Sequence, residues 1–161
     1  MTAYEKYTLV LQTLVAVAAF ISVYLVLNQL RAMSTQIEAT QNASEAQSII
    51  SIVNFLQAAE AREARAAVRS SLSKTHHNAW DEIQKRHAST VCANYDVVAA
   101  LLKAGLIRNK HVILENWSPS IKHCHQVLAP FIDSQRREPG GDPKYWQNFE
   151  WLKTQCGENA T

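Results

Sequence analysis

The chain has 161 residues, 47% of them hydrophobic, and a formal net charge of +2. A charge this close to neutral does not indicate the basic surface of a nucleic-acid-binding domain. Only four glycines and four prolines are present, and the first of either is Gly105. Tight turns depend on these residues, so their absence before Gly105 excludes sandwiches, barrels and glycine-rich phosphate loops from that region. The composition therefore predicts an all-α fold.

An apolar segment lies near the start of the chain. Residues 8–27 contain no charged side chain, and twelve of these twenty residues are Leu, Val, Ile or Phe. Twenty helical residues span roughly 30 Å, the thickness of the hydrocarbon core of a bilayer. Apolar residues lie on every side of this helix, whereas a surface helix of a soluble protein shows a single stripe. We therefore predict a single-pass transmembrane anchor over residues 1–30, with the lipid bilayer as its partner.

Two other interpretations of this segment stay open, a buried helix of a soluble core and a cleaved signal peptide. Residues 32–34 (Ala-Met-Ser) form a passable cleavage pattern, but the apolar run exceeds the usual ~7–15 residues and Glu5 interrupts the basic leader. Too few charges flank the segment to fix its orientation. The three cysteines do not form a secreted disulfide framework. We expect a protein of the cell inner membrane whose C-terminal domain is cytoplasmic.

Helical patterns continue after the anchor. Residues 31–45 are polar but contain no helix breaker, so we expect a helical stalk with a bend or break within it. Apolar residues then return at helical spacing from Ala46, which predicts an amphipathic helix to about Ser73. We expect residues 46–157 to form a small antiparallel helical bundle and residues 158–161 to be a disordered tail.

Capping signals divide the bundle into helices. Asn78 is a suitable N-cap for a helix that Gly105 ends, with a core stripe from Val91 to Leu102. Ser118-Pro119 and Asp142-Pro143 each combine an N-cap residue with proline at the first helical position, so we expect the last two helices to begin there. The buried face of the last helix should consist of Tyr145, Trp146, Phe149 and Leu152.

Metal and catalytic motifs are weak. His123, Cys124 and His125 form the densest cluster, but successive helical residues point 100° apart, so the two histidines cannot face one ion. We expect no metal and no cofactor, with Cys92 and Cys124 as small core residues. No nucleophile elbow or paired-carboxylate motif is present, so an enzyme is not indicated.

Three arginines are the best candidates for a binding face. Arg62, Arg65 and Arg69 fall within about 60° of one helix surface. Guanidinium groups in line can bind phosphate or carboxylate groups. The simpler interpretation is that they pair with acids of neighbouring helices, and Asp96 is one candidate partner of Arg65. Trp117 is expected among the aromatic residues of the core or of an interface, as is Trp146.

Several stretches together carry a family resemblance: VYLVLNQLR, NFLQAAEAREARAAV, VCANYDVVAALLKAGLI, NWSPSIKHCHQVLAPFI and YWQNFEWL. In this order they resemble a family of small, uncharacterised bacterial membrane-anchored proteins with a helical domain of unknown function, over about residues 5–152. The resemblance draws attention to Arg62, Arg65, Asp96, Trp117 and Trp146, and it implies no activity.

The sequence supports three hypotheses about function. The first is a membrane-tethered helical interaction or scaffold module, which either forms a homo-oligomer or binds an unidentified protein, and which does not bind nucleic acid. The second is a regulatory domain that binds an anionic ligand or lipid headgroup through the arginine face. The third is a metal or redox protein that uses its cysteines and histidines.

Overall fold

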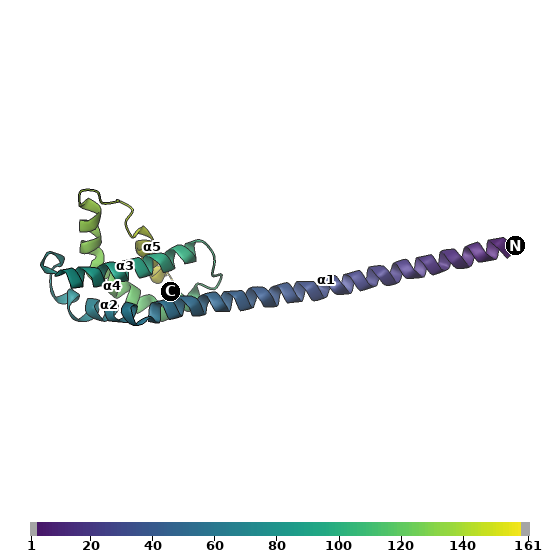
Figure 1. The fold of residues 1–161 in the computed structure, drawn as a ribbon, viewed down its shortest axis with the longest axis horizontal. Helices are drawn as coiled ribbons and strands as arrows, with labels where there is room; N and C mark the ends of the chain where they lie inside the picture. The colour runs from purple at the N-terminus through teal and green to yellow at the C-terminus, as the bar shows by residue number, and fades with distance from the viewer. Residues whose placement is uncertain (1–2, 159–161) are drawn as a thin grey trace. The chain divides into compact units, whose positions relative to one another are not determined.

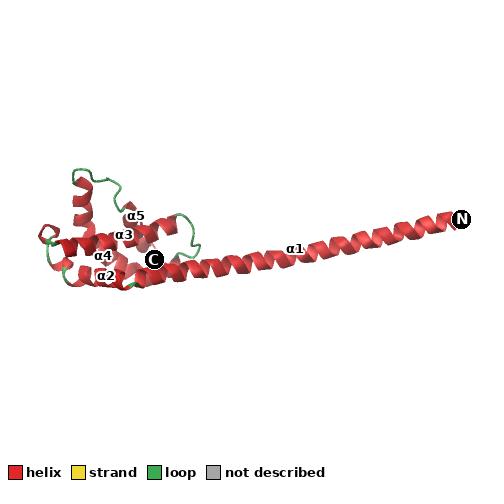
Figure 2. Ribbon diagram, in the orientation of Figure 1, coloured by secondary structure: helices red, strands yellow, loops and turns green. Residues whose placement is uncertain are grey.

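The computed structural model describes residues 3–158. Of the expected disordered tail, residues 159–161 lie outside the described residues, and Glu158 is helical and not disordered. The described part of the chain contains five α-helices, two short 3-10 helices and no strand, so the all-α prediction is confirmed (Figure 2). Contacts within the chain divide it into two units, Met1–Ser44 and Glu45–Thr161.

The first helix, α1, extends over Ala3–Gln57 and so begins in the first unit. It contains the one helix segment in the described residues, Leu11–Gln57, that is long and apolar enough to cross a membrane by length and composition. Its most apolar 18-residue window has a mean hydropathy of 1.9 and no buried residue. The side chains of residues 11–27 are all exposed.

The break that we expected within residues 31–45 is absent, because the helix is continuous as far as Gln57. Polar side chains in this stretch bond back onto the helix: the hydroxyl groups of Thr35 and Thr40 donate to carbonyls one turn earlier. The first interruption is at Ala58, whose ψ of 145° lies outside the helical region.

Four helices follow in the second unit: α2 (Ala59–Ser70), α3 (Glu82–Lys103), α4 (His111–Arg137) and α5 (Gln147–Glu158). Between α2 and α3 the chain forms the short 3-10 helices η1 (Leu72–Lys74) and η2 (His77–Ala79). Helix α3 contacts α2, α4 and α5, and α4 also contacts α2 and α5 (Figure 1). The bundle is therefore built around α3.

The predicted core stripe of α3 is confirmed. Its buried members are Val91, Cys92, Tyr95, Val98, Ala99 and Leu102. On α5 the expected Phe149 and Leu152 are fully buried, but Tyr145 is 48% exposed and precedes the helix. All three cysteines are free and buried, as expected for Cys92 and Cys124.

Helix α3 begins later than predicted and ends where predicted. Its N-cap is Asp81, not Asn78, because Asp81 and Gln84 form a reciprocal capping box with hydrogen bonds of 2.8 and 3.0 Å. At the other end, Gly105 has a φ of +71°, which glycine adopts without strain. The amides of Gly105 and Leu106 bond back to the last turn, completing a Schellman motif.

The predicted starts of the last two helices are wrong. Helix α4 begins at His111 and contains Pro119 in its interior. The added turns bury Ile113 and Leu114, and this apolar burial offsets the hydrogen bond that Pro119 cannot make. Helix α5 begins at Gln147, after Trp146 in the left-handed region at φ 53°. Asp142 instead initiates a turn, accepting from the amide of Lys144.

Candidate functional site: an arginine groove

The three predicted arginines lie on α2, which begins directly after the interruption of the helix at Ala58. Ala61, Ala64 and Val68 form the buried face of this helix. Arg65 borders that face and is only 5% exposed, whereas Arg62 and Arg69 are exposed. The helix therefore holds one buried guanidinium group between two accessible ones, each about one turn away.

Two contacts fix the side chain of Arg65. Its Nη2 atom donates to the carbonyl oxygen of Leu56 at 2.5 Å. Leu56 lies at the end of α1, where carbonyl groups have lost their helical partners. The guanidinium carbon also lies 4.8 Å from the centre of the Trp117 ring, a cation–π arrangement. Arg65 thus joins the end of α1 to α4.

The surroundings of Arg65 disfavour its charge. Burial lowers the pKa of the Arg65 guanidinium from its usual value, and the positive charges of Arg69 and Arg62 act in the same direction. The hydroxyl group of Tyr95, which acts in the opposite direction on this pKa, is hydrogen-bonded to the hydroxyl group of Ser120 at 2.8 Å. No carboxylate contributes to this environment.

Arg65, Trp117 and Ser120 line an open groove of about 660 Å³ within the second unit. Its walls come from the end of α1, from α2 and from α4, and are formed by Val53, Gln57, Arg62, Arg65, Arg69, Asn116, Trp117 and Ser120. We call this feature the arginine groove. Its lining carries three positive charges and no acidic side chain, and within residues 3–158 no ion pair involves any of the three arginines.

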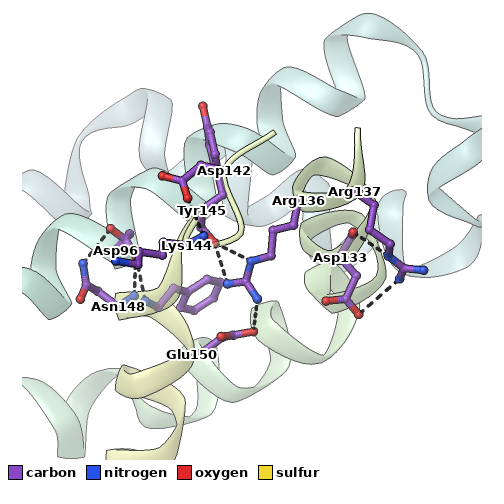
Figure 3. A network of polar contacts seen from close by, with 10 residues as sticks. Asp96, Asp133, Arg136, Arg137, Asp142, Lys144, Tyr145, Asn148 and Glu150 are labelled. Carbon is purple, nitrogen blue, oxygen red and sulfur yellow. Dashed lines mark hydrogen bonds and ion pairs between the residues drawn. The ribbon is translucent and has the colours of Figure 1, made fainter. Parts of the chain in front are cut away.

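Asp96, which the sequence offered as one candidate partner of Arg65, does not pair with it. Asp96 instead caps the start of α5 from the neighbouring helix α3 (Figure 3). Its Oδ1 atom accepts from the backbone amides of Asn148 at 2.8 Å and Phe149 at 3.1 Å, and Oδ2 accepts from the Asn148 side chain at 3.2 Å. A negative charge at this position also interacts favourably with the helix dipole.

Sequence reasoning missed the second group that holds α5 in place. Arg136, on α4, donates from Nε and Nη2 to the carbonyl oxygen of Tyr145 and from Nη1 to Glu150 at 2.9 Å (Figure 3). We call Asp96, Arg136, Asn148 and Glu150 the α5 anchor. No motif marks Arg136, because its role arises only when the loop after α4 turns back.

The two predicted tryptophans have different surroundings. Trp117 is half-buried and forms part of the arginine groove. Trp146 is also half-buried but stacks on Phe131, with ring centres 5.9 Å apart. The structure therefore brings Arg62, Arg65, Arg69 and Trp117 together, and places Asp96 and Trp146 near the start of α5.

The cysteines and histidines do not form a site. Among the described residues, no group of three or more His, Cys, Asp or Glu side chains is arranged to hold a metal ion. Burial raises the pKa of the thiols of Cys92, Cys124 and Cys156, so each favours the neutral form, which is a poor metal ligand and nucleophile.

One comparison with known proteins identifies a family. The family model described as "Domain of unknown function (DUF4760)" matches residues 12–156, nearly the whole chain. Comparisons with the curated proteins and with the solved structures find no match.

Proposed function

The chain belongs to the DUF4760 family, a helical domain of unknown biochemical role, and we propose that it is a single-pass membrane protein that presents this domain as a binding module. In this proposal the anchor lies in the cell inner membrane and the bundle is on the cytoplasmic side. The module acts by contact with a partner, either another protein or a second copy of the chain, and not by catalysis.

The observation that carries the proposal is the exposure of residues 11–27, which make up most of the apolar segment. Every side chain from residue 11 to residue 27 is exposed, including Phe20 at 78% and Tyr24 at 65%. Contiguous apolar surface of this extent is typical of membrane spans and binding interfaces, and a length of about 20 residues fits a bilayer. The bundle meanwhile has a core of its own, with side chains such as Leu128 and Phe149 fully buried.

The extent of the family match supports a retained anchor over a removed leader. The match begins at residue 12, inside the apolar segment, so the family domain includes most of that segment. The helix also continues past the possible cleavage position at residues 32–34. We therefore propose that the segment is retained in the mature protein.

Membrane fractionation tests the anchor. We expect the full chain to stay in the pellet after alkaline carbonate extraction, without cleavage near residues 32–34. Replacing Leu14 and Val17 by arginine should release it, because each charge at the centre of a span costs about 2.5–3.5 kcal/mol. The matched control replaces Met33 and Ile37, two exposed apolar residues beyond the span, and should stay in the pellet. Cleavage near Ser34 would contradict the proposal.

Crosslinking in intact membranes, followed by mass spectrometry, tests the binding role. We expect crosslinks from surface lysines of the bundle, such as Lys103 and Lys122, to a second copy or to another protein. If every crosslink lies within one chain while the protein remains in the membrane, the proposed scaffold role is wrong. The proposal of a membrane anchor would not be affected by that result.

A further inference from the structure

We propose that the arginine groove binds a phosphate group, carried either by a soluble compound or by the headgroup of an anionic lipid. This ligand goes beyond the scaffold role proposed above, because that role concerns a protein partner, whereas the groove would bind a soluble phosphate compound or a lipid headgroup. The groove and its three arginines lie entirely within the second unit, and the argument uses only side chains of that unit.

The first argument is the unbalanced charge. Buried charges in proteins are paired, because an unpaired ion loses its hydration without compensation. Arg65 is 5% exposed, yet its polar partner is the neutral carbonyl of Leu56 and its other contact is the Trp117 ring. Within the described residues its charged neighbours are two more arginines. An anion in the groove would supply the missing negative charge.

The second argument is the arrangement of the donors. Like charges three and four residues apart on a helix destabilise it, so Arg62 and Arg69 add repulsion around Arg65. A bound anion converts this repulsion into attraction. The Leu56 carbonyl and the Trp117 ring already hold Arg65 in place, which reduces the side-chain entropy lost on binding. Arg62 and Arg69 are exposed and can close on the ligand from either side.

The third argument selects phosphate over carboxylate. A phosphate monoester carries about −1.5 to −2 charges and three strong acceptor oxygens, whereas a carboxylate carries one charge and two oxygens. Three guanidinium groups therefore match a phosphate better, and Asn116 and Ser120 offer further polar groups in the lining. The guanidinium group of Arg65 already packs on the Trp117 ring, so that face of the ring is not free to stack on a nucleobase.

Binding of inorganic phosphate to the full chain in phosphatidylcholine nanodiscs tests the site. We expect calorimetric titration to show saturable binding of phosphate, and at least tenfold weaker binding of acetate at the same ionic strength. The double variant Arg62→Gln/Arg69→Gln should weaken phosphate binding by about a hundredfold, since it removes two charge-assisted donors and each such hydrogen bond is worth roughly tenfold. The control, Arg86→Gln/Arg137→Gln, removes the same charge from two exposed arginines outside the groove and should bind like the wild type.

Three outcomes of this titration would overturn the proposal. They are absence of saturable phosphate binding, equal binding of phosphate and acetate, or equal weakening by both double variants. The last result would mean that net charge, and not the groove, attracts the anion. Neither double variant removes a buried side chain, so failure to fold does not account for a loss of binding.

Nanodiscs that also contain phosphatidic acid distinguish the two sources of phosphate. If the ligand is a headgroup, phosphatidic acid should compete, and the dissociation constant for inorganic phosphate should rise at least fivefold for the wild type. If the ligand is soluble, that constant should stay within twofold. Either result supports the phosphate site and identifies its source. Both are independent of whether the anchor spans the membrane in cells, which the fractionation experiment decides.

Discussion

The α5 anchor and the arginine groove differ in how their charges are balanced. In the α5 anchor, Asp96 accepts three hydrogen bonds from the start of α5. Arg136 donates there to a backbone carbonyl and to Glu150, so opposite charges meet. In the arginine groove three positive charges converge without an acid, and the one that is buried, Arg65, bonds to a neutral carbonyl.

The difference separates structural charges from charges available for binding. The α5 anchor replaces a local cap that α5 lacks, so its groups are already used by the fold. The arginine groove has surplus donors and positive charge that the fold does not neutralise. Removal of a side chain from the α5 anchor should therefore mainly lower the stability of the bundle. Removal of a side chain from the arginine groove should mainly weaken ligand binding.

Asp96→Ala should have the largest effect on stability. It leaves two backbone amides at the start of α5 without their acceptor, and we expect a loss of about 2 kcal/mol in the free energy of unfolding. In thermal unfolding this corresponds to a drop of roughly 6–12 °C. Asp96→Asn retains an acceptor oxygen and should lose about half as much.

The control for this prediction is Asp133→Ala. Asp133 is exposed and forms only a 4.0 Å pair with Arg137 on its own helix, so its loss should change stability by less than about 0.5 kcal/mol. Equal losses for the two alanine variants would show that Asp96 does not cap α5.

Arg65→Met should cost less, about 1 kcal/mol. The variant leaves the carbonyl of Leu56 without its donor, but it also removes a buried charge, and methionine can still pack on Trp117. Chemical denaturation measures this change. A loss above about 3 kcal/mol is typical of a broken buried ion pair and would contradict the absence of an acidic partner.

A double-mutant cycle on Arg65 and Asp96 tests whether the arginine groove and the α5 anchor are energetically independent. The two side chains have different partners on different helices, so their losses should add, with a coupling energy below about 0.5 kcal/mol. A larger coupling energy would indicate a direct interaction between Arg65 and Asp96, as the sequence suggested.

Acid should weaken the bundle near α5 through His125. The Nε2 atom of His125 is buried without a hydrogen-bond partner among the described residues, and its ring lies edge-on to Phe149. Burial lowers the pKa of His125 below its usual value of 6.5, so protonation favours the unfolded chain. Its contribution to stability is present above about pH 6.5 and is lost as the pH falls through the lower folded-state pKa.

Melting temperatures between pH 7.5 and 5 test the histidine. The wild type should melt at lower temperature as the pH falls, and His125→Asn should show a smaller decrease. His123→Asn, an exposed neighbour on the same helix, should follow the wild type. An unchanged pH dependence in His125→Asn would show that this histidine does not carry the effect.

The smallest effect on stability is expected for Arg62→Gln/Arg69→Gln. Both side chains are exposed and repel Arg65, so their removal should change the free energy of unfolding by no more than about 0.5 kcal/mol, in either direction. Denaturant unfolding without phosphate measures this. A loss above about 1 kcal/mol would mean that these arginines are structural, as Asp96 is.

The sequence predicted those features that depend on neighbouring residues. The apolar segment, the core stripe of α3 and the end at Gly105 follow from periodicity and local backbone preference. The spacing of the three arginines likewise placed them on one helix face. Trp117 was named from the sequence, but its position beside Arg65 depends on how α4 packs against α2.

Features that depend on tertiary contacts could not be predicted. Asp96 caps a helix 52 residues further along the chain, and no local pattern marks such a cap. The two X-Pro signals at residues 119 and 143 were misleading, because burial of Ile113 and Leu114 extends α4 and the cap from α3 delays α5. Local capping preferences, worth about 1 kcal/mol, were outweighed by packing.

Arginine-directed chemical modification tests the central distinction most directly. The full chain in phosphatidylcholine nanodiscs is treated with phenylglyoxal, with and without phosphate, and the modified residues are quantified by mass spectrometry. We predict that phosphate slows modification of Arg62 and Arg69 severalfold and leaves the exposed Arg86 and Arg137 unchanged. Equal rates at all four arginines with and without phosphate would contradict the assignment of the arginine groove as an anion site.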